Sequence, residues 1–267
     1  MEATATTNRY ADVYLDLLSA GPETVFLLSP SGDAFHELVD VLDIIAPSIR
    51  VLGDSAILNE EMDDFMLATL AADHNAADQL AIRTADLGWD NRIVGPSSVI
   101  SMVECGEGVI YAGGEAEYNS IDFTDLTDQW SAADQFHIDT PPLSRIRDSL
   151  EREVGSSTTQ DFNALLDVTD TVCARSDSVG ADVLILLAGA LNDALLNDLF
   201  LWAEEIGLAS SATLSRRKMQ LEDGGFITTE KVPRQLGRPR LRLHLTDEFD
   251  QHSTTELAAV VQERLTG

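Results

Sequence analysis

Residues 195–226 decide the fold of the C-terminal third and read LLNDLFLWAEEIGLASSATLSRRKMQLEDGGF. The first part, residues 195–206, carries apolar side chains at helical spacing, which predicts a helix. Gly207 follows and supplies the positive φ that a tight turn between helices needs. An apolar segment over 183–191 precedes it and predicts a buried helix. Two helices joined by a short turn are therefore expected here.

A third helix is expected over residues 212–222. Ser210 and Ser211 stand just before it and offer the side-chain oxygens that cap a helix N-terminus. Gly224 and Gly225 follow and stop it. The whole stretch therefore predicts a helix-turn-helix whose last helix is the recognition helix.

The recognition helix carries side chains suited to DNA. Leu214 and Leu221 are expected to face the core, and Thr213, Arg216, Arg217 and Gln220 are expected to share the opposite face at helical spacing. Arg reads guanine, Gln reads adenine and Thr reads either kind of edge in the major groove. The predicted DNA-binding residues of this helix and its cap are Ser210, Ser211, Thr213, Ser215, Arg216, Arg217, Lys218 and Gln220.

A basic hairpin is expected after the recognition helix. A strand begins near residues 226–229, and residues 240–246 alternate basic and apolar side chains, which predicts a strand with its apolar side inward. Residues 237–240 read GRPR and resemble the core of minor-groove AT-hook segments, in which an Arg beside Pro suits a narrow groove. The hairpin is thus a candidate wing, with Arg234, Arg238, Arg240 and Arg242 as predicted DNA-binding residues.

The chain is strongly acidic, with 46 Asp and Glu against 17 Lys and Arg and a net charge of −29. Residues 216–242 are the exception, because they hold eight basic residues and three acidic ones. The basic segment is either a DNA-binding surface or a chance cluster paired with acids elsewhere in the fold. The acidic remainder is typical of proteins from salt-loving archaea, since at about 1 M salt the Debye length is only about 3 Å. Acidic mimicry of nucleic acid is the alternative.

The N-terminal half alternates short apolar runs with helical patterns and then continues with runs separated by Gly turns. Strand-helix-strand-helix-strand followed by antiparallel hairpins indicates an α/β domain. The expected strands are 25–28, 49–52, 80–83, 92–94, 99–104 and 108–111, and the expected helices are 33–46 and 57–72.

The predicted organisation is therefore an α/β, sensor-like domain, a helical connector and a winged helix-turn-helix domain. The domains are expected over 1–142, 143–180 and 181–267, the last ending in an amphipathic helix over 254–265. The connector carries an apolar stripe that either packs within the monomer or forms a dimer. A homodimer is expected because most helix-turn-helix proteins read two half-sites. The stripe consists of Phe162, Leu165, Leu166, Val168 and Val172.

An effector site is expected in the N-terminal domain. Residues 29–33 read SPSGD and open a helix after the first apolar run, where backbone N–H groups and the helix dipole favour an anion. A small phosphorylated metabolite is the expected effector. The alternative is that Ser31 or Asp33 only caps the helix and that the arginines pair with carboxylates. The candidate effector residues are Ser29, Ser31, Gly32, Arg50, Arg83 and Arg92.

The sequence gives little support for an enzyme, a bound cofactor or metal, or a membrane protein. The sequence has no P-loop and no dinucleotide-binding glycine motif. Its five histidines have no metal-ligand spacing. Cys105 and Cys173 are expected to be reduced core residues. No signal peptide and no run long enough to span a bilayer is present, so a cytoplasmic protein is expected.

The run LASSATLSRR over 208–217, with LEDGGFI over 221–227, resembles the recognition helix and first wing strand of prokaryotic winged-helix regulators. Lys218 departs from that pattern, which usually has an apolar residue there. The chain as a whole resembles the haloarchaeal TbsP family of transcription regulators. That resemblance implies promoter DNA as partner and control of glycolysis and gluconeogenesis genes. Two alternatives remain: a module whose basic wing docks an acidic protein, or a metabolite enzyme with an accessory winged helix.

Overall fold

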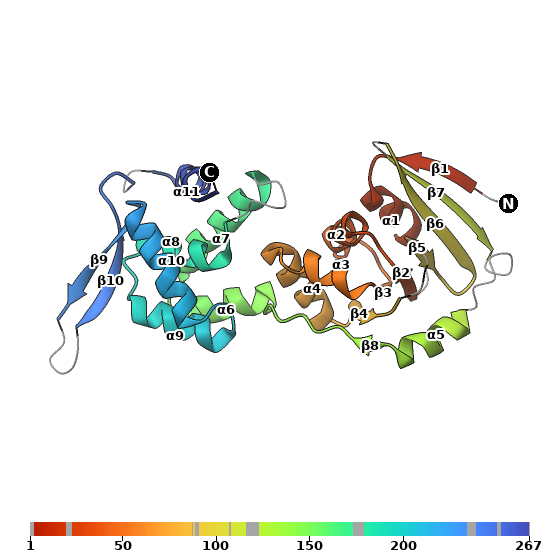
Figure 1. Cartoon of the computed structure of the whole chain (residues 1–267), viewed down its shortest axis with the longest axis horizontal. Helices are drawn as coiled ribbons and strands as arrows, with labels where there is room; N and C mark the ends of the chain where they lie inside the picture. The colour runs from red at the N-terminus through yellow and green to blue at the C-terminus, as the bar shows by residue number, and fades with distance from the viewer. Residues whose placement is uncertain are drawn as a thin grey trace. The chain divides into compact units, whose positions relative to one another are not determined.

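Figure 1 shows the computed structural model of the chain. It describes residues 3–19, 23–86, 88, 91–106, 108–115, 123–172, 179–233, 239–249 and 252–266. The chain divides into an N-terminal unit of residues 1–63 and 67–139 and a C-terminal unit of residues 140–267 together with 64–66. Among the described residues, none of the helices combines the length and apolar character needed to cross a membrane.

The N-terminal unit is built on a mixed eight-stranded sheet in the order β1-β7-β6-β5-β2-β3-β4-β8. Strands β2, β3 and β4 are parallel, and the other pairings are antiparallel, including the predicted hairpins β5-β6 and β6-β7. The strands are β1 (Ala3–Thr7), β2 (Thr24–Leu28), β3 (Ser48–Gly53), β4 (Leu80–Thr84), β5 (Arg92–Val94), β6 (Ser98–Cys105), β7 (Gly108–Glu115) and β8 (Asp134–Gln135).

Successive side chains along the parallel strands point to opposite faces of the sheet, so the N-terminal core has two parts. Val25 and Leu27 belong to a large cluster with helices α1 and α2, whereas Phe26 and Leu28 pack with Trp130 of α5 on the other face. The helices of this unit are α1 (Tyr10–Leu18), α2 (Gly32–Val41), α3 (Ser55–Glu61), α4 (Phe65–Ala76) and α5 (Phe123–Ala132).

One predicted helix of this unit is wrong. Residues 57–72 were expected as a single helix, but they belong to α3 and α4, which are separated by a turn. Asp54 starts α3 early, because its carboxylate accepts from Ala56 N (2.7 Å) and Ile57 N (3.4 Å). Cys105 also differs from expectation, since its side chain is exposed at the end of β6. Cys173 lies outside the described residues.

The C-terminal unit packs around the apolar helix α8, in which nine of eleven residues are buried. Helix α7 contacts α8 and α11, and α6 contacts α7 and α9. Phe162, Leu165 and Leu166 of the predicted stripe are buried within this unit, so they pack inside the monomer. The elements are α6 (Leu143–Glu153), α7 (Ser156–Val172), α8 (Ala181–Leu191), α9 (Leu196–Ile206), α10 (Ser211–Asp223), β9 (Ile227–Val232), β10 (Arg240–Leu245) and α11 (Thr254–Thr266).

Candidate nucleic-acid interface

Helices α8, α9 and α10 and the hairpin β9-β10 form the winged helix-turn-helix (Figure 1). Gly207 ends α9 in the left-handed conformation (φ 84°). Ser210 caps α10, because its Oγ accepts from Thr213 N at 3.1 Å. Gly225, just beyond α10, has a φ of 74°. These turn residues therefore act as the sequence predicted.

The outward face of α10 is centred on Arg216. Leu214 and Leu221 are fully buried, as expected. Arg216, Met219 and Gln220 are exposed on the opposite side, and Met219 is 54% exposed. Arg216 has no ion pair or hydrogen bond to any residue that the structure describes. Met219 was not predicted as part of this face, and its apolar side chain suits contact with a thymine methyl group.

Arg217 does not share that face. Its Nε lies 2.8 Å from Asp182 Oδ2 at the start of α8, and its Nη1 donates to Gln220 Oε1 at 3.1 Å. Three residues after Leu214 and four before Leu221, Arg217 stands on the flank that turns toward the core. The expectation of an outward Arg217 is therefore corrected.

Other polar residues around α10 are also engaged within the unit. Lys218 Nζ lies 2.6 Å from Glu222 Oε2, and the lysine side chain is only 15% exposed. Ser211 Oγ donates to Glu204 Oε2 at 2.7 Å, which ties α10 to α9. Ser215 is exposed. Of these predicted DNA-binding residues, Ser215 remains accessible and the others are held by internal contacts.

The basic side of β10 faces acids of the same unit. Arg240 Nη1 lies 3.5 Å from Asp198 Oδ2. His244 stands between Asp193 and Glu230, with its Nδ1 hydrogen-bonded to Asp193 Oδ1. The ion pair of Arg240 reduces the positive charge that the sequence segment 216–242 carries.

Arg242 and the wing tip complete the set of predicted residues. Arg242 forms a β-bridge with Leu195, and its Nε is buried without a hydrogen-bond partner among the described residues. Lys231 is exposed on β9 and has no ion pair with a described residue. Arg234 and Arg238 lie outside the described residues. Among the described residues of the segment 216–242, Arg216 and Lys231 are therefore the exposed cations without an internal ion pair.

Ser29 and Ser31 of the candidate effector loop after β2 form hydrogen bonds within the unit. Ser29 N donates to Leu52 O (2.7 Å), and Ser31 N donates to Asn91 Oδ1 (2.8 Å). Ser31 Oγ accepts from Ala34 N (3.3 Å), so it caps α2. Ser31 therefore caps α2, which is the first part of the alternative stated for this loop.

Carboxylates of the chain itself lie around the start of α2. The Glu61 carboxylate occupies the space where a side chain at Gly32 would lie, and Asp33 is in the first helical turn. A helix N-terminus attracts anions, but here the chain already provides them. The loop geometry therefore disfavours an external anion.

Arg50 and Arg83 come together at another place, on the sheet face beneath α5. Their guanidinium carbons lie 5.7 Å and 5.1 Å from the centre of the Trp130 ring. Neither forms an ion pair with a described acid. Arg92 begins β5 opposite Leu28, on the same face, and makes contacts of its own.

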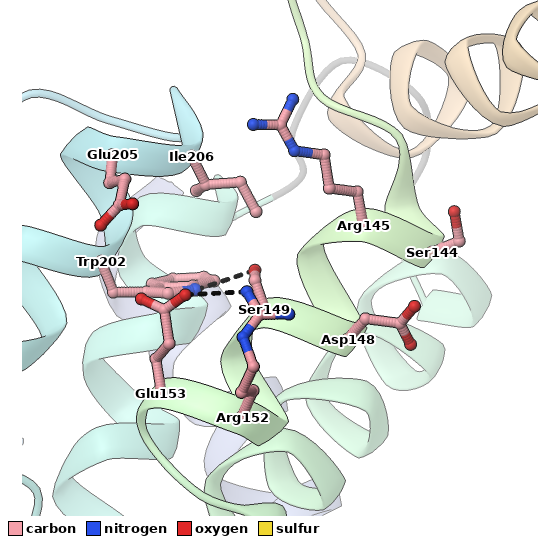
Figure 2. A pocket seen from close by; sticks show the side chains of 9 residues that line it. All are labelled: Ser144, Arg145, Asp148, Ser149, Arg152, Glu153, Trp202, Glu205 and Ile206. Atoms are coloured by element: carbon pink, nitrogen blue, oxygen red, sulfur yellow. Dashed lines mark hydrogen bonds and ion pairs between the residues drawn. The ribbon is translucent and has the colours of Figure 1, made fainter.

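A separate hollow of about 400 Å³ lies between α6 and α9 in the C-terminal unit (Figure 2). Trp202 and Ile206 form its apolar part, and Trp202 Nε1 donates to Ser149 Oγ at 3.0 Å. Its charged lining is mixed, with Arg145 and Arg152 among Asp148, Glu153 and Glu205. Because basic and acidic side chains both line this hollow, its charge favours neither an anionic nor a cationic ligand.

Comparisons with known proteins agree with this architecture. The family model described as "Transcriptional regulator TbsP-like, N-terminal" matches residues 2–141. The model described as "Transcriptional regulator TbsP-like, C-terminal HTH domain" matches residues 142–262. None of the curated proteins compared with the sequence matches it significantly.

Among solved structures, the chain is similar to TrmBL2, described as an archaeal chromatin protein with a novel mode of DNA binding. The identity is 11%, the TM-score is 0.32, and the match covers 50% of this chain and 54% of that chain. The match thus spans about half the length of TrmBL2. The two family models together extend over almost the whole sequence. The chain belongs to the TbsP-like family of transcriptional regulators.

Proposed function

We propose that the chain is a sequence-specific DNA-binding regulator that inserts α10 into the major groove of promoter DNA. The observation that carries the proposal is the exposed, unpaired Arg216 beside Gln220 in a chain with a net charge of −29. A solvent-facing helix in such a chain would be expected to carry carboxylates. Arg and Gln instead offer bidentate contacts to guanine and adenine edges.

The wing supplies the second contact in this proposal. Lys231 on β9 and the arginines at 234 and 238 would follow the phosphate backbone or enter the minor groove. The regulator would act as a homodimer on two half-sites. Its acidic remainder would suit a cytoplasm with molar salt.

The proposed target genes are those of central carbon metabolism, including glycolysis and gluconeogenesis, as the family resemblance implies. The N-terminal unit would be the input domain and would bind a small phosphorylated sugar metabolite. Arg50 and Arg83 on its parallel strands support that role, because guanidinium groups bind phosphate through charge-assisted hydrogen bonds.

Chromatin immunoprecipitation with sequencing in the native host tests the proposal. Wild type, Arg216→Ala and the control Arg152→Ala would be compared at equal protein levels under several carbon sources. Arg152 is an exposed arginine on α6 that pairs only with its neighbour Glu153. We expect promoter peaks for wild type and Arg152→Ala that are lost with Arg216→Ala.

The same experiment separates the alternatives. Peaks unchanged by Arg216→Ala would contradict the role given to α10. An absence of peaks in every strain would favour a protein-docking role for the basic wing, which pull-down experiments would then address. Turnover of a phosphorylated metabolite by the purified chain would favour the enzyme alternative.

A further inference from the structure

A hollow of about 350 Å³ opens at the amino ends of the parallel strands in the N-terminal unit. Thr24 and Ser48, the first residues of β2 and β3, line one side. Arg50, Arg83 and Trp130 line another. The volume is in the range of small-ligand sites.

Strand register explains why two arginines reach this hollow. Arg50 stands opposite Phe26 on one neighbour and Ala81 on the other, so the three side chains share a sheet face. Arg83 is two residues after Ala81 and points to the same face. Both arginines then meet Trp130, which α5 brings down onto the sheet.

Arg83 is fixed by the end of α5. Its Nη1 donates to the carbonyls of Trp130 (2.7 Å), Ser131 (3.2 Å) and Ala133 (3.1 Å). The other guanidinium nitrogens of Arg83 carry no hydrogen bond to a described residue. The side chain is thus held in place and still has donors to offer.

Arg50 has aromatic neighbours but no anion. It packs over the rings of Phe26 and Trp130, each at 5.7 Å, and it has no hydrogen bond or ion pair with a described residue. Among the described residues that line the hollow, Asp78 is the one carboxylate, against two arginines. In a chain with 46 acidic residues, two guanidinium groups on one indole ring leave a positive charge that an external anion would neutralise.

We propose that this hollow binds a small phosphorylated ligand, whose phosphate contacts Arg50 and Arg83. Phosphate fits better than a single carboxylate, because it carries more charge and can accept from two guanidinium groups at once. Ser48, Gln135 and Asn75 lie along the rest of the wall and offer hydrogen bonds to hydroxyl groups. The role of this ligand as effector rests on the proposed function, whereas the binding site does not.

Calorimetric titration of the full chain in KCl buffer tests the proposal. The probes are inorganic phosphate, glycerol 3-phosphate and glucose 6-phosphate, with glycerol, glucose and citrate at matched ionic strength as comparisons. The variants are Arg50→Gln and, as matched control, Arg145→Gln in the hollow between α6 and α9. We expect saturable binding of at least one phosphorylated probe, weakened about tenfold or more by Arg50→Gln and unchanged by Arg145→Gln.

Three results would overturn the proposal: no saturable binding by folded wild type, binding that survives Arg50→Gln, or a preference for citrate over every phosphorylated probe. Arg83→Lys keeps a cation while weakening the contacts to α5, and it is also expected to lower affinity. DNA binding is measured separately on the same samples. Anion binding without DNA binding would support this site and contradict the regulator, and DNA binding without anion binding would do the reverse.

Discussion

Arg217 Nε lies 2.8 Å from Asp182 Oδ2, and this ion pair ties the recognition helix to the first turn of α8. The Asp182 side chain is 14% exposed, and its other oxygen accepts from Val183 N at 2.9 Å. A carboxylate at a helix N-terminus is favoured by the helix dipole. Arg217 therefore orients α10 through its partner, while its neighbour Arg216 faces outward.

Adjacent arginines of α10 should thus respond differently to mutation. Arg216→Ala should weaken binding to a cognate operator by about 10- to 100-fold, since a bidentate base contact contributes about 1–3 kcal/mol. Its melting temperature should stay near that of wild type. Fluorescence anisotropy and thermal unfolding measure the two quantities.

Arg217→Ala should mainly reduce stability. Removing it leaves Asp182 partly buried without its cation, which should cost about 1 kcal/mol after screening by solvent at a side chain that is 37% exposed. Asp182→Asn should give a similar loss, and the double variant should not be the sum of both. Equal stability of wild type and Arg217→Ala would contradict the role of this ion pair.

The facing of α10 also shows what the sequence could predict. Leu214 and Leu221 were identified as core residues, and that assignment fixes the helix rotation. The same rotation places Arg217 beside these two leucines. Arg217 was nevertheless predicted to face outward, because arginine is a residue type that suits DNA contact. Glu222 is only four positions from Lys218, but Asp182 and Asp198 are 35 and 42 positions away from their partners Arg217 and Arg240. Only the tertiary fold brings such groups together.

Substitution of Gly207 measures how much a side chain at a left-handed backbone position lowers stability. Its φ is 84°, and a Cβ there would have no heavy atom within 4 Å, so Gly207→Ala adds strain without a clash. The substitution should destabilise the chain by about 1 kcal/mol. Gly207→Asn should cost less, because Asn tolerates the left-handed region better. Denaturant unfolding of both variants provides the test, and an Asn variant less stable than the Ala variant would contradict the assignment.

The hydrogen bond of the Trp202 indole gives a third test of stability. Its Nε1 donates to Ser149 Oγ (3.0 Å), and Ser149 Oγ in turn donates to Ile146 O (3.1 Å). Ser149→Ala leaves the indole N–H without its partner and should cost about 1–3 kcal/mol. The same change in a Trp202→Phe background should cost less. Equal losses in both backgrounds, measured by urea unfolding, would show that the hydrogen bond contributes nothing.

Strand β1 and helices α1 and α5 were not predicted from the sequence, although α1 has a clear apolar face. Strand β1 is ATATT, which alternates Ala and Thr but has no large apolar side chain, and among the described strands it pairs only with β7 at the sheet edge. Helix α5 buries just Leu126 and Trp130. Trp130 nevertheless brings Arg50 and Arg83 together. The sequence therefore identified these two arginines as candidate ligand-binding residues, but it did not predict that they lie together beneath α5.

Salt dependence tests how few cations contact DNA. Paired side chains such as Lys218 and Arg240 release no counterions, and Arg216 reads a base edge, so at most about three cations per chain contact phosphate, namely Lys231, Arg234 and Arg238. The slope of log K against log salt should then be no steeper than about −3 per bound chain. Lys231→Ala should make this slope shallower by about 1. Arg216→Ala should instead lower the affinity by the same factor at all salt concentrations, because Arg216 reads a base edge. Anisotropy titrations between about 0.5 M and about 2 M KCl would measure this. A slope near twice that value would mean that the ion pairs around α10 open when DNA binds.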